Sequence, residues 1–341
     1  MMMKALLKKF LPLPAAKQNA MEARIFGKIE QLQNEMEAQI SGKIEQLREE
    51  VRSLRGELSA LRGNEIKVIL QNSKSVFSYC NNRALERQAG NSSVFDERYA
   101  HYKRLHSLLH VYAVGGGARF VRGGGRNRVK NDIDGEYVMV SPFSREKTAY
   151  SFGICDDVSW DKAMAECGYQ VFMYDHTIDR LPEENDAFHW EKLGVTGETE
   201  TSSLKTLASL IKENGHEKVS GMFLKMDVEG CEWEVLRSCP ESVLSQFDQI
   251  ALELHDLHNM QDADLHIAAL ENLTKNHAAV YVHGNNYRGC VFSGDLITPQ
   301  TLEVTLVKKD VYELSDCDMR ELGQLNKPND PNNYEILLGN W

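Results

Sequence analysis

SGMFLKMDVEGCEWEVLRSC, residues 220–239, joins a strand pattern directly to a helix pattern. SGMFLKMD at 220–227 is an apolar run that predicts a buried strand, and the run ends in an acidic residue. CEWEVLRSC at 231–239 then has the apolar spacing of a helix. Gly230 between them favours a tight turn. A strand followed so closely by a helix is the repeating unit of parallel sheets covered by helices.

The same alternation continues on both sides of this unit. Its regularity predicts an α/β fold with a mostly parallel sheet and helices on both faces. The remaining predicted strands are 148–154, 169–175, 188–195, 247–255, 277–283 and 302–312, and the remaining predicted helices are 161–168, 203–214 and 263–276.

Ligands of open α/β sheets bind beyond the carboxyl ends of the strands, and this rule selects candidate residues. Gly153 stands at the end of the first predicted strand, where a backbone without a Cβ can approach a ligand closely. Asp175 ends the second strand, 22 residues later. A carboxylate at about this spacing accepts hydrogen bonds from ribose hydroxyls in nucleotide-binding folds. Later strand ends deliver Asp227, Glu229, Glu253, His255, His283, Asn285 and Asn286.

Several of these residues stand in motifs of a known family. LKMDVEGCEWEVL (224–236) and IALELH (250–255) resemble the fourth-strand signature and the fifth-strand Glu-x-His of FkbM-like class I S-adenosylmethionine-dependent methyltransferases. DGEYVM (134–139) resembles the DGGYV element of a related branch, with Glu136 in place of its second glycine. YSFGICDDVSWD (150–161), VHGNNY (282–287) and LEVTLVKKD (302–310) are similar to that branch as well.

The resemblance covers residues 130–312 and implies a fold and an activity. The fold is a Rossmann-like sheet of seven strands with the last one antiparallel. The cofactor is S-adenosyl-L-methionine, and the acceptor is a hydroxyl of a sugar, polysaccharide or glycolipid precursor. We therefore expect an O-methyltransferase.

Roles follow for the residues at the strand ends. His255 is the expected general base, because the ordinary pKa of histidine, about 6.5, suits proton transfer at neutral pH. Asp227 is expected near the transferred methyl group or the cofactor's amino acid moiety, and Glu253 beside His255. Glu229 is expected to have a structural or orienting role, because Gly230 favours a turn there and the acid can accept from nearby amides. His283, Asn285 and Asn286 are expected either to contact the acceptor or to form an Asx-type turn. The expected cofactor contacts are Ser151, Phe152, Gly153, Asp175 and Asp227.

One departure from the family pattern leaves an alternative open. Class I methyltransferases commonly carry GxGxG after the first strand, whereas this sequence offers only SFGICDD at 151–157. The alternative is a non-catalytic coiled-coil scaffold that carries a degenerate methyltransferase domain. Asp156 or Asp157 is expected to cap the next helix rather than to contact the cofactor.

No metal is expected. Asp227, His255 and His283 would supply one carboxylate and two imidazoles, which is the composition of a facial triad. However, strand seven separates strands five and six in this fold, so His255 and His283 are expected to be held apart.

The N-terminal segment has a different pattern. Ile44, Leu47, Val51, Leu54, Leu58 and Leu61 recur at heptad spacing within a segment rich in Glu, Gln, Lys and Arg. This predicts a coiled coil over 21–64 that self-associates; packing on the domain or a single loose helix are the alternatives. The other predicted divisions are a basic amphipathic start (1–20), a helical and Gly/Arg-rich lead-in (65–130), the methyltransferase domain (131–325) and a tail (326–341).

The lead-in contains two glycine triplets, at 115–117 and 123–125, which exclude a helix. Arg119, Arg122, Arg126, Arg128 and Lys130 make it the most basic stretch of the chain. It either holds an anion through its arginines and amides or forms a solvated hairpin.

Charge and cysteine content limit the class of protein. The net charge is −11, and residues 150–341 carry 14 basic and 34 acidic residues, which disfavours a nucleic-acid binder. The seven cysteines form no CxxC pair, and we expect reduced thiols and a cytoplasmic protein. No run approaches the ~18 apolar residues of a membrane span. At most, the basic start touches anionic lipid weakly.

Overall fold

The computed structural model describes residues 92–124, 135–293, 296–317, 325–333, 335, 336 and 338, together with single helical positions between Met21 and Lys43. The chain divides into two units, Met1–Ile66 and Lys67–Trp341. The basic start at 1–20 and the three basic residues Arg126, Arg128 and Lys130 lie outside the described residues. So does most of the predicted coiled coil at 21–64, and these predictions stay untested.

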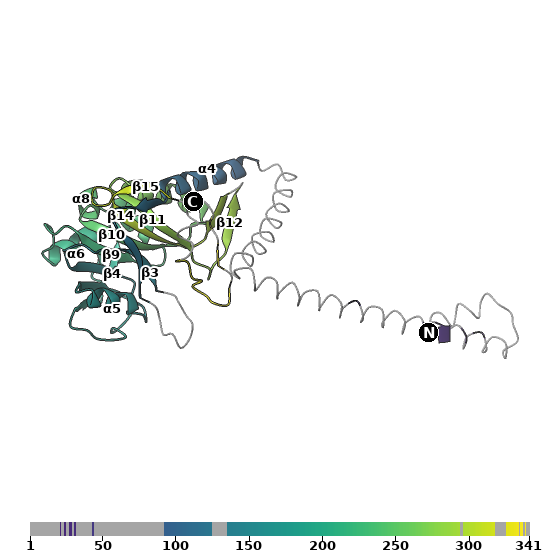
Figure 1. Ribbon diagram of the computed structural model, residues 1–341, viewed down its shortest axis with the longest axis horizontal. Coiled ribbons are helices and arrows are strands. Elements are labelled where there is room, and N and C mark those ends of the chain that lie inside the picture. The colour runs from purple at the N-terminus through teal and green to yellow at the C-terminus, as the bar shows by residue number, and fades with distance from the viewer. Residues whose placement is uncertain are drawn as a thin grey trace. The chain divides into compact units, whose positions relative to one another are not determined.

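The second unit is built on one large sheet (Figure 1). Within the described residues, seven strands form it in the order β11-β14-β10-β9-β4-β5-β6. Neighbours pair in parallel except β14, which runs antiparallel to both β10 and β11. The predicted seven-stranded sheet with an antiparallel last strand is confirmed. The strands are β4 (Thr148–Phe152), β5 (Gln170–Tyr174), β6 (Phe188–Glu191), β9 (Met222–Met226), β10 (Phe247–Leu254), β11 (His277–Gly284) and β14 (Leu302–Lys308).

Helices cover both faces of the sheet because its strands are apolar on both sides. One core contains Tyr150, Leu224 and Leu252 of the sheet, packed with side chains from α4, α6, α7, α8 and α9. On the other face, Phe223 packs with Trp160 and Met164 of α5. The helices are α4 (Ser92–Leu108), α5 (Ser159–Glu166), α6 (Leu207–Glu213), α7 (Glu232–Ser238), α8 (Glu241–Leu244) and α9 (Ala263–Leu273), with a short 3-10 turn, η1 (Met260–Asp262).

A hairpin covers the rest of the face that α5 leaves open. β2 (Arg119–Gly123) pairs antiparallel with β3 (Tyr137–Ser141), and Tyr137 and Met139 reach the same core as α5. The described part of the basic stretch, with Arg119 and Arg122, is therefore the first strand of a hairpin and ends at Gly123. Arg122 does not point freely into solvent, because it bonds Glu136 at 3.1 Å and the carbonyl of Leu325.

A small additional strand pair, β7 with β8, changes two of the predicted elements. The strand expected at 188–195 is divided into β6 and the separate β7 (Gly194–Thr196). The helix expected at 203–214 begins only at Leu207, because β8 (Leu204–Thr206) pairs with β7 first. Thr206 then caps the helix, since its hydroxyl accepts from the amide of Ser209 at 3.2 Å. Two further small sheets are β1 (Tyr112–Val114) with β15 (Leu314–Asp316), and β12 (Cys290–Ser293) with β13 (Leu296–Pro299).

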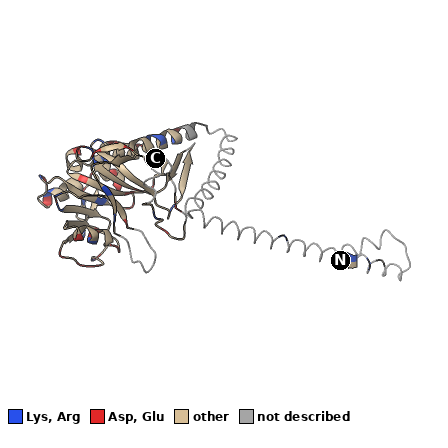
Figure 2. Cartoon of the chain, in the orientation of Figure 1, with Lys and Arg blue, Asp and Glu red and all other residues tan. Residues whose placement is uncertain are grey.

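Charged residues are distributed over separate elements of the second unit. Figure 2 shows Lys and Arg on α4 and on other helices and strands, interspersed with Asp and Glu. In the part of the chain that the structure describes, no helix is long and apolar enough to cross a membrane.

Candidate active site

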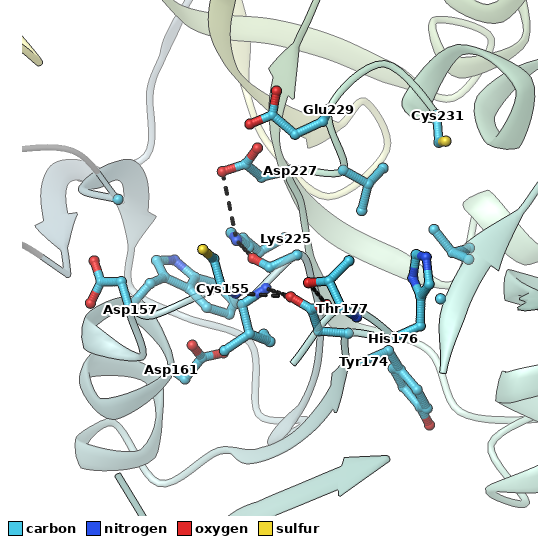
Figure 3. Close-up of a pocket in the computed structure, with 18 of the residues that line it drawn as sticks. Cys155, Asp157, Asp161, Tyr174, His176, Thr177, Lys225, Asp227, Glu229 and Cys231 are labelled. Atoms are coloured by element: carbon cyan, nitrogen blue, oxygen red, sulfur yellow. Dashed lines mark hydrogen bonds and ion pairs between the residues drawn. The ribbon is translucent and has the colours of Figure 1, made fainter. Parts of the chain in front are cut away.

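A cavity of about 760 Å³ opens at the carboxyl ends of β4, β5 and β9. This volume falls within the usual range of small-molecule sites, roughly 300–1,000 Å³. Four of the residues predicted from the strand ends line it: Gly153, Asp175, Asp227 and Glu229. Figure 3 shows Asp227 and Glu229 among the lining side chains. Apolar walls come from Tyr174, Val195 and Leu204.

Gly153 brings the backbones of β4 and β9 together. Its φ is +76°, and a Cβ on it would lie 1.5 Å from the carbonyl oxygen of Asp227. An L-residue therefore fits neither the conformation nor the space. The close neighbour that requires a glycine here is thus the protein's own backbone at Asp227, and the predicted approach of a ligand to Gly153 stays a prediction.

Asp175 connects the loops after β4 and β5. Its Oδ2 accepts from the amides of Ile154 and Cys155 at 2.9 and 2.8 Å. Its Oδ1 accepts from the amide and the hydroxyl of Thr177 at 2.7 and 2.6 Å. Burial by itself would raise the pKa of Asp175, but these four hydrogen bonds outweigh it and lower the pKa. Because a carboxylate has about four acceptor sites, a ribose hydroxyl at Asp175 would replace an existing bond, most easily that of the Thr177 hydroxyl.

Ser151 and Phe152 do not reach the cavity. Both are fully buried within β4. Asp157, next along, accepts from the amide and hydroxyl of Ser159 at 2.9 and 3.0 Å. Ser159 is the first residue of α5, so these bonds lie next to the helix start, but the N-cap position itself is Val158 and has no side-chain cap bond. The predicted aspartate cap is therefore wrong in this form, and both Asp156 and Asp157 line the cavity.

Asp227 lies where the hairpin meets the sheet. Its Oδ2 accepts from the Tyr137 hydroxyl at 3.0 Å and lies 4.0 Å from Nζ of Lys225. Burial, followed by the carboxylates of Asp227 and Glu253, raises the pKa of Tyr137, so this phenol remains a hydrogen-bond donor. Lys225 also donates to the carbonyl of Gly153 at 2.5 Å. Asp227 and Lys225 together thus connect β3 and β9 with Gly153, the residue that follows β4, at the cavity wall.

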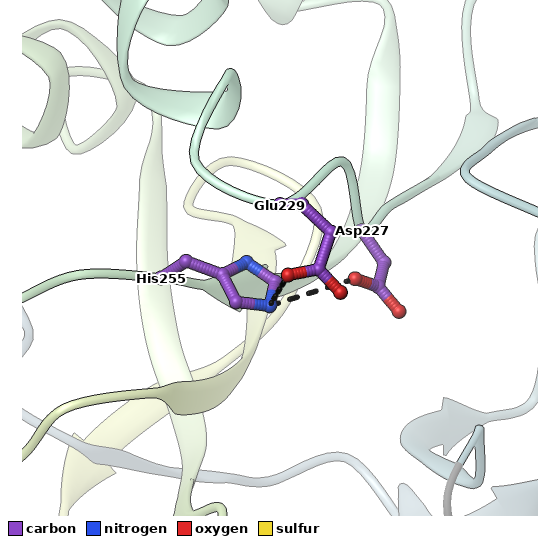
Figure 4. A group of neighbouring side chains, drawn as sticks. All are labelled: Asp227, Glu229 and His255. Atoms are coloured by element: carbon purple, nitrogen blue, oxygen red, sulfur yellow. Dashed lines mark ion pairs between the residues drawn. The ribbon is translucent and has the colours of Figure 1, made fainter. Parts of the chain in front are cut away.

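His255 follows β10 and is almost completely buried, with 5% of its side chain exposed. Its Nδ1 lies 2.9 Å from Oε1 of Glu232, and because a carboxylate only accepts, Nδ1 carries the hydrogen. Nε2 faces Glu229 at 3.7 Å, Glu253 at 3.7 Å and Asp227 at 3.9 Å. Figure 4 shows Nε2 directed toward Asp227 and Glu229.

The surroundings of His255 change its acidity. Burial would lower the pKa of His255, but the hydrogen bond to Glu232 and the charges of Glu232, Asp227 and Glu229 outweigh burial and raise it. The sequence-based choice of His255 as base assumed an ordinary histidine pKa. The structure instead shows an imidazole whose protonated form is favoured by its neighbours.

Glu232, rather than Glu229, supports the turn after β9. Glu232 is fully buried and accepts from the amides of Val228 and Gly230 at 2.9 and 2.8 Å. Glu229 has 76% of its side chain exposed and lines the cavity. The sequence suggested the orienting role for Glu229, because the acids of DVEGCE do not differ in type; burial alone separates them.

The three residues predicted to contact the acceptor have partners within the protein. Asn285 donates to Glu253 at 2.7 Å, and its side-chain oxygen accepts from the Tyr287 amide at 2.9 Å, which forms the Asx-type turn considered as the alternative. Asn286 exchanges two hydrogen bonds with the backbone of Asp330, at 2.9 and 2.7 Å. None of the three lines the described cavity.

His283 is part of a buried ion-pair cluster instead. Its Nδ1 lies 2.9 Å from Glu303 and its Nε2 lies 2.6 Å from Glu335, with 1% of the side chain exposed. Burial by itself would lower the pKa of His283, but the two carboxylates raise it to about 9. As predicted, β14 separates His283 from His255, because β14 lies between β10 and β11.

Sequence reasoning missed three residues of the site: Tyr137, Lys225 and Glu232. Tyr137 and Lys225 stand inside motifs that the sequence did single out, DGEYVM and LKMDVEG. Lys225 and Asp227 face the same side because they are two residues apart at the end of one strand, whereas the contact of Tyr137 with Asp227 depends on the packing of the hairpin against the sheet. No pattern within DGEYVM reports that packing.

Comparison with known proteins agrees with the geometry. Residues 125–287 match the model of the methyltransferase FkbM domain. This match contains every strand of the large sheet except β14. It supports a methyltransferase-like domain and a methyltransferase function.

Two further comparisons give no additional support for a methyltransferase function. The comparison with curated proteins finds no match. A solved structure described as "Putative hemolysin from Streptococcus thermophilus" aligns over 52% of this chain and 73% of its own, with 11% identity and a TM-score of 0.29. A likeness this weak carries no argument.

Proposed function

We propose that this domain is an S-adenosylmethionine-dependent O-methyltransferase that acts on a hydroxyl of a sugar, polysaccharide or glycolipid precursor. The observation that carries the proposal is the acid-lined cavity of about 760 Å³ at the carboxyl ends of β4, β5 and β9. It lies in a domain whose sequence matches the methyltransferase FkbM model. The acceptor class comes from the family resemblance.

The donor set of the cavity fits S-adenosylmethionine. Tyr174, Val195 and Leu204 offer an apolar wall of the kind that suits an adenine ring. Asp175 offers a carboxylate to the ribose hydroxyls in exchange for the Thr177 bond. Asp227 and Glu229 offer negative charge to the cofactor's cationic end. When bound, the cofactor supplies a methyl group on a positively charged sulfur.

The protein's own part is to hold the acceptor hydroxyl and to take up its proton. Asp227, which lines the cavity, and His255 and Glu253 next to it are the candidates, because both carboxylates have an oxygen within 3.9 Å of His255 Nε2. Glu232 fixes the ring of His255 from behind, and Tyr137 holds the carboxylate of Asp227. Groups held in this way need no reorganisation during the reaction.

Calorimetric titration of the full chain with S-adenosylmethionine and S-adenosylhomocysteine tests the proposal. We expect binding of both ligands at one site per chain. Asp175→Asn should weaken both by at least tenfold, because the amide cannot accept all four hydrogen bonds that order the loops. Glu183→Gln, which alters an exposed ion pair with Lys162, is the matched control and should bind as the wild type does. No heat with either ligand in the wild type would favour the non-catalytic scaffold.

A further inference from the structure

Three ligand-type atoms converge beside the cavity. They are one carboxylate oxygen each from Asp227 and Glu229 and one ring nitrogen of His255, and all lie within 4.8 Å of one another (Figure 4). Asp227 and Glu229 also line the cavity. The group is therefore accessible to a ligand from the cavity side.

His255 Nε2 lacks a hydrogen-bond partner among the described residues. Its nearest polar atoms are carboxylate oxygens at 3.7, 3.7 and 3.9 Å, which is too far for a hydrogen bond. Because Nδ1 carries the hydrogen bonded to Glu232, the lone pair of a neutral ring points at these oxygens. A lone pair and several anionic oxygens that face one another in a buried position repel one another. A positive charge between them would stabilise the arrangement.

A metal ion satisfies this geometry better than a proton does. A proton on Nε2 reaches none of the three carboxylates at hydrogen-bond distance. Ligand atoms in adjacent positions around a cation with bonds of about 2.0–2.4 Å lie ~3–4 Å apart, which is close to the observed separations. In addition, a histidine whose second nitrogen is held by a carboxylate, as Glu232 holds His255, is the usual arrangement of a metal-bound histidine.

We propose that Asp227, Glu229 and His255 bind a divalent first-row cation, Mn²⁺ or Zn²⁺. One imidazole and two carboxylates suit these ions; Mg²⁺ and Ca²⁺ favour oxygen ligands throughout. Two positive charges compete with the cation. Nζ of Lys225 lies 4.0 Å from Oδ2 of Asp227, the oxygen that does not face His255, and Nη2 of Arg288 lies 3.8 Å from Glu229. The Arg288 side chain is 47% exposed and also pairs with Asp256, so it can leave Glu229 at little cost.

The role of the cation rests on the proposed function. An acceptor hydroxyl bound to the cation becomes more acidic, as water does on a catalytic metal. Its O–H bond breaks and the proton passes to a carboxylate, for which Glu253 is the nearest further candidate at 3.7 Å from Nε2. His255 then orients the cation instead of acting as a free base.

The test is titration of the full chain, stripped with a chelator and dialysed. Mn²⁺ binding is followed by electron paramagnetic resonance and Zn²⁺ binding by calorimetry. We expect one ion per chain in the wild type. Glu229→Gln and His255→Gln should each weaken binding by at least tenfold. Glu234→Gln is the matched control, because it removes a carboxylate from the first turn of α7, the helix that follows Glu229, and lies outside the three-ligand group.

Two outcomes would overturn the proposal: no binding of either ion by the wild type, or equal affinities for Glu229→Gln and Glu234→Gln. Since Glu229 is exposed, its substitution leaves the fold intact, and unchanged thermal unfolding would verify this. S-adenosylmethionine titrations of the same samples separate the two ideas. Cofactor binding without metal binding refutes this inference alone, whereas metal binding without cofactor binding refutes the proposed function.

Discussion

Single residues of this site are fixed by contacts that allow little variation. Glu232 illustrates this, because one buried carboxylate orders the turn after β9 and also holds the ring of His255. Asp175 does the same for the loops after β4 and β5. Both residues shape the cavity through the backbone, so their loss would alter ligand binding even without direct contact.

Gly153 gives the sharpest prediction at this scale. We expect Gly153→Ala to lower the free energy of unfolding by about 3 kcal/mol or more, because a new Cβ meets the Asp227 carbonyl at 1.5 Å. Gly215→Ala is the control: its φ of +74° is almost the same, but nothing lies within 4 Å. It should cost only the backbone strain, about 1 kcal/mol. Equal losses in urea unfolding would contradict the account of Gly153.

At the scale of elements, the large sheet carries a row of polar residues beneath the hairpin. Glu303 of β14 stands opposite Glu253 of β10 and His283 of β11. Two facing carboxylates are unfavourable unless positive charge and donors accompany them. His283 supplies the charge to Glu303, and Asn285 donates to Glu253.

The pH dependence of the unfolding free energy should test whether His283 carries a positive charge in this row of polar residues. The folded-state pKa of His283 is raised to about 9 from an ordinary 6.5. Its stabilising effect is thus complete below about pH 6.5 and is lost as the pH rises through about 9. Between pH 6 and 9.5 the wild type should lose roughly 3 kcal/mol more unfolding free energy than His283→Gln, measured in urea. The same pH dependence in both proteins would refute the buried imidazolium.

The elements also show which parts of the structure could be predicted from the sequence. The strands of the sheet are predictable because parallel strands buried on both faces appear as apolar runs, as in MFLKM at 222–226. The β7–β8 pair was missed because each strand has only three residues, too few for a periodic signal. The partners of His283 could not be predicted, since Glu335 reaches it from 52 positions away.

At the scale of the whole molecule, the two units have separate roles in our account. The second unit, Lys67–Trp341, contains the large sheet and the candidate site. The first unit, Met1–Ile66, contains the predicted coiled coil, which lies mostly outside the described residues.

Deletion of residues 1–66 should therefore change assembly without changing the site. We expect the full chain to be an oligomer and the truncated chain a monomer by multi-angle light scattering, because the heptad seam is removed. S-adenosylhomocysteine affinity should stay within about twofold. An unchanged assembly state would refute self-association through this segment.

The central claim is that the cavity between Gly153, Asp175 and Asp227 holds S-adenosylmethionine. A crystal structure grown with saturating S-adenosylhomocysteine tests it most directly. We predict electron density for the ribose beside Asp175, with the Thr177 hydroxyl displaced, and density for the sulfur end on the side of Asp227. Ligand density elsewhere on the molecule, or an empty cavity at saturating ligand, would contradict the account.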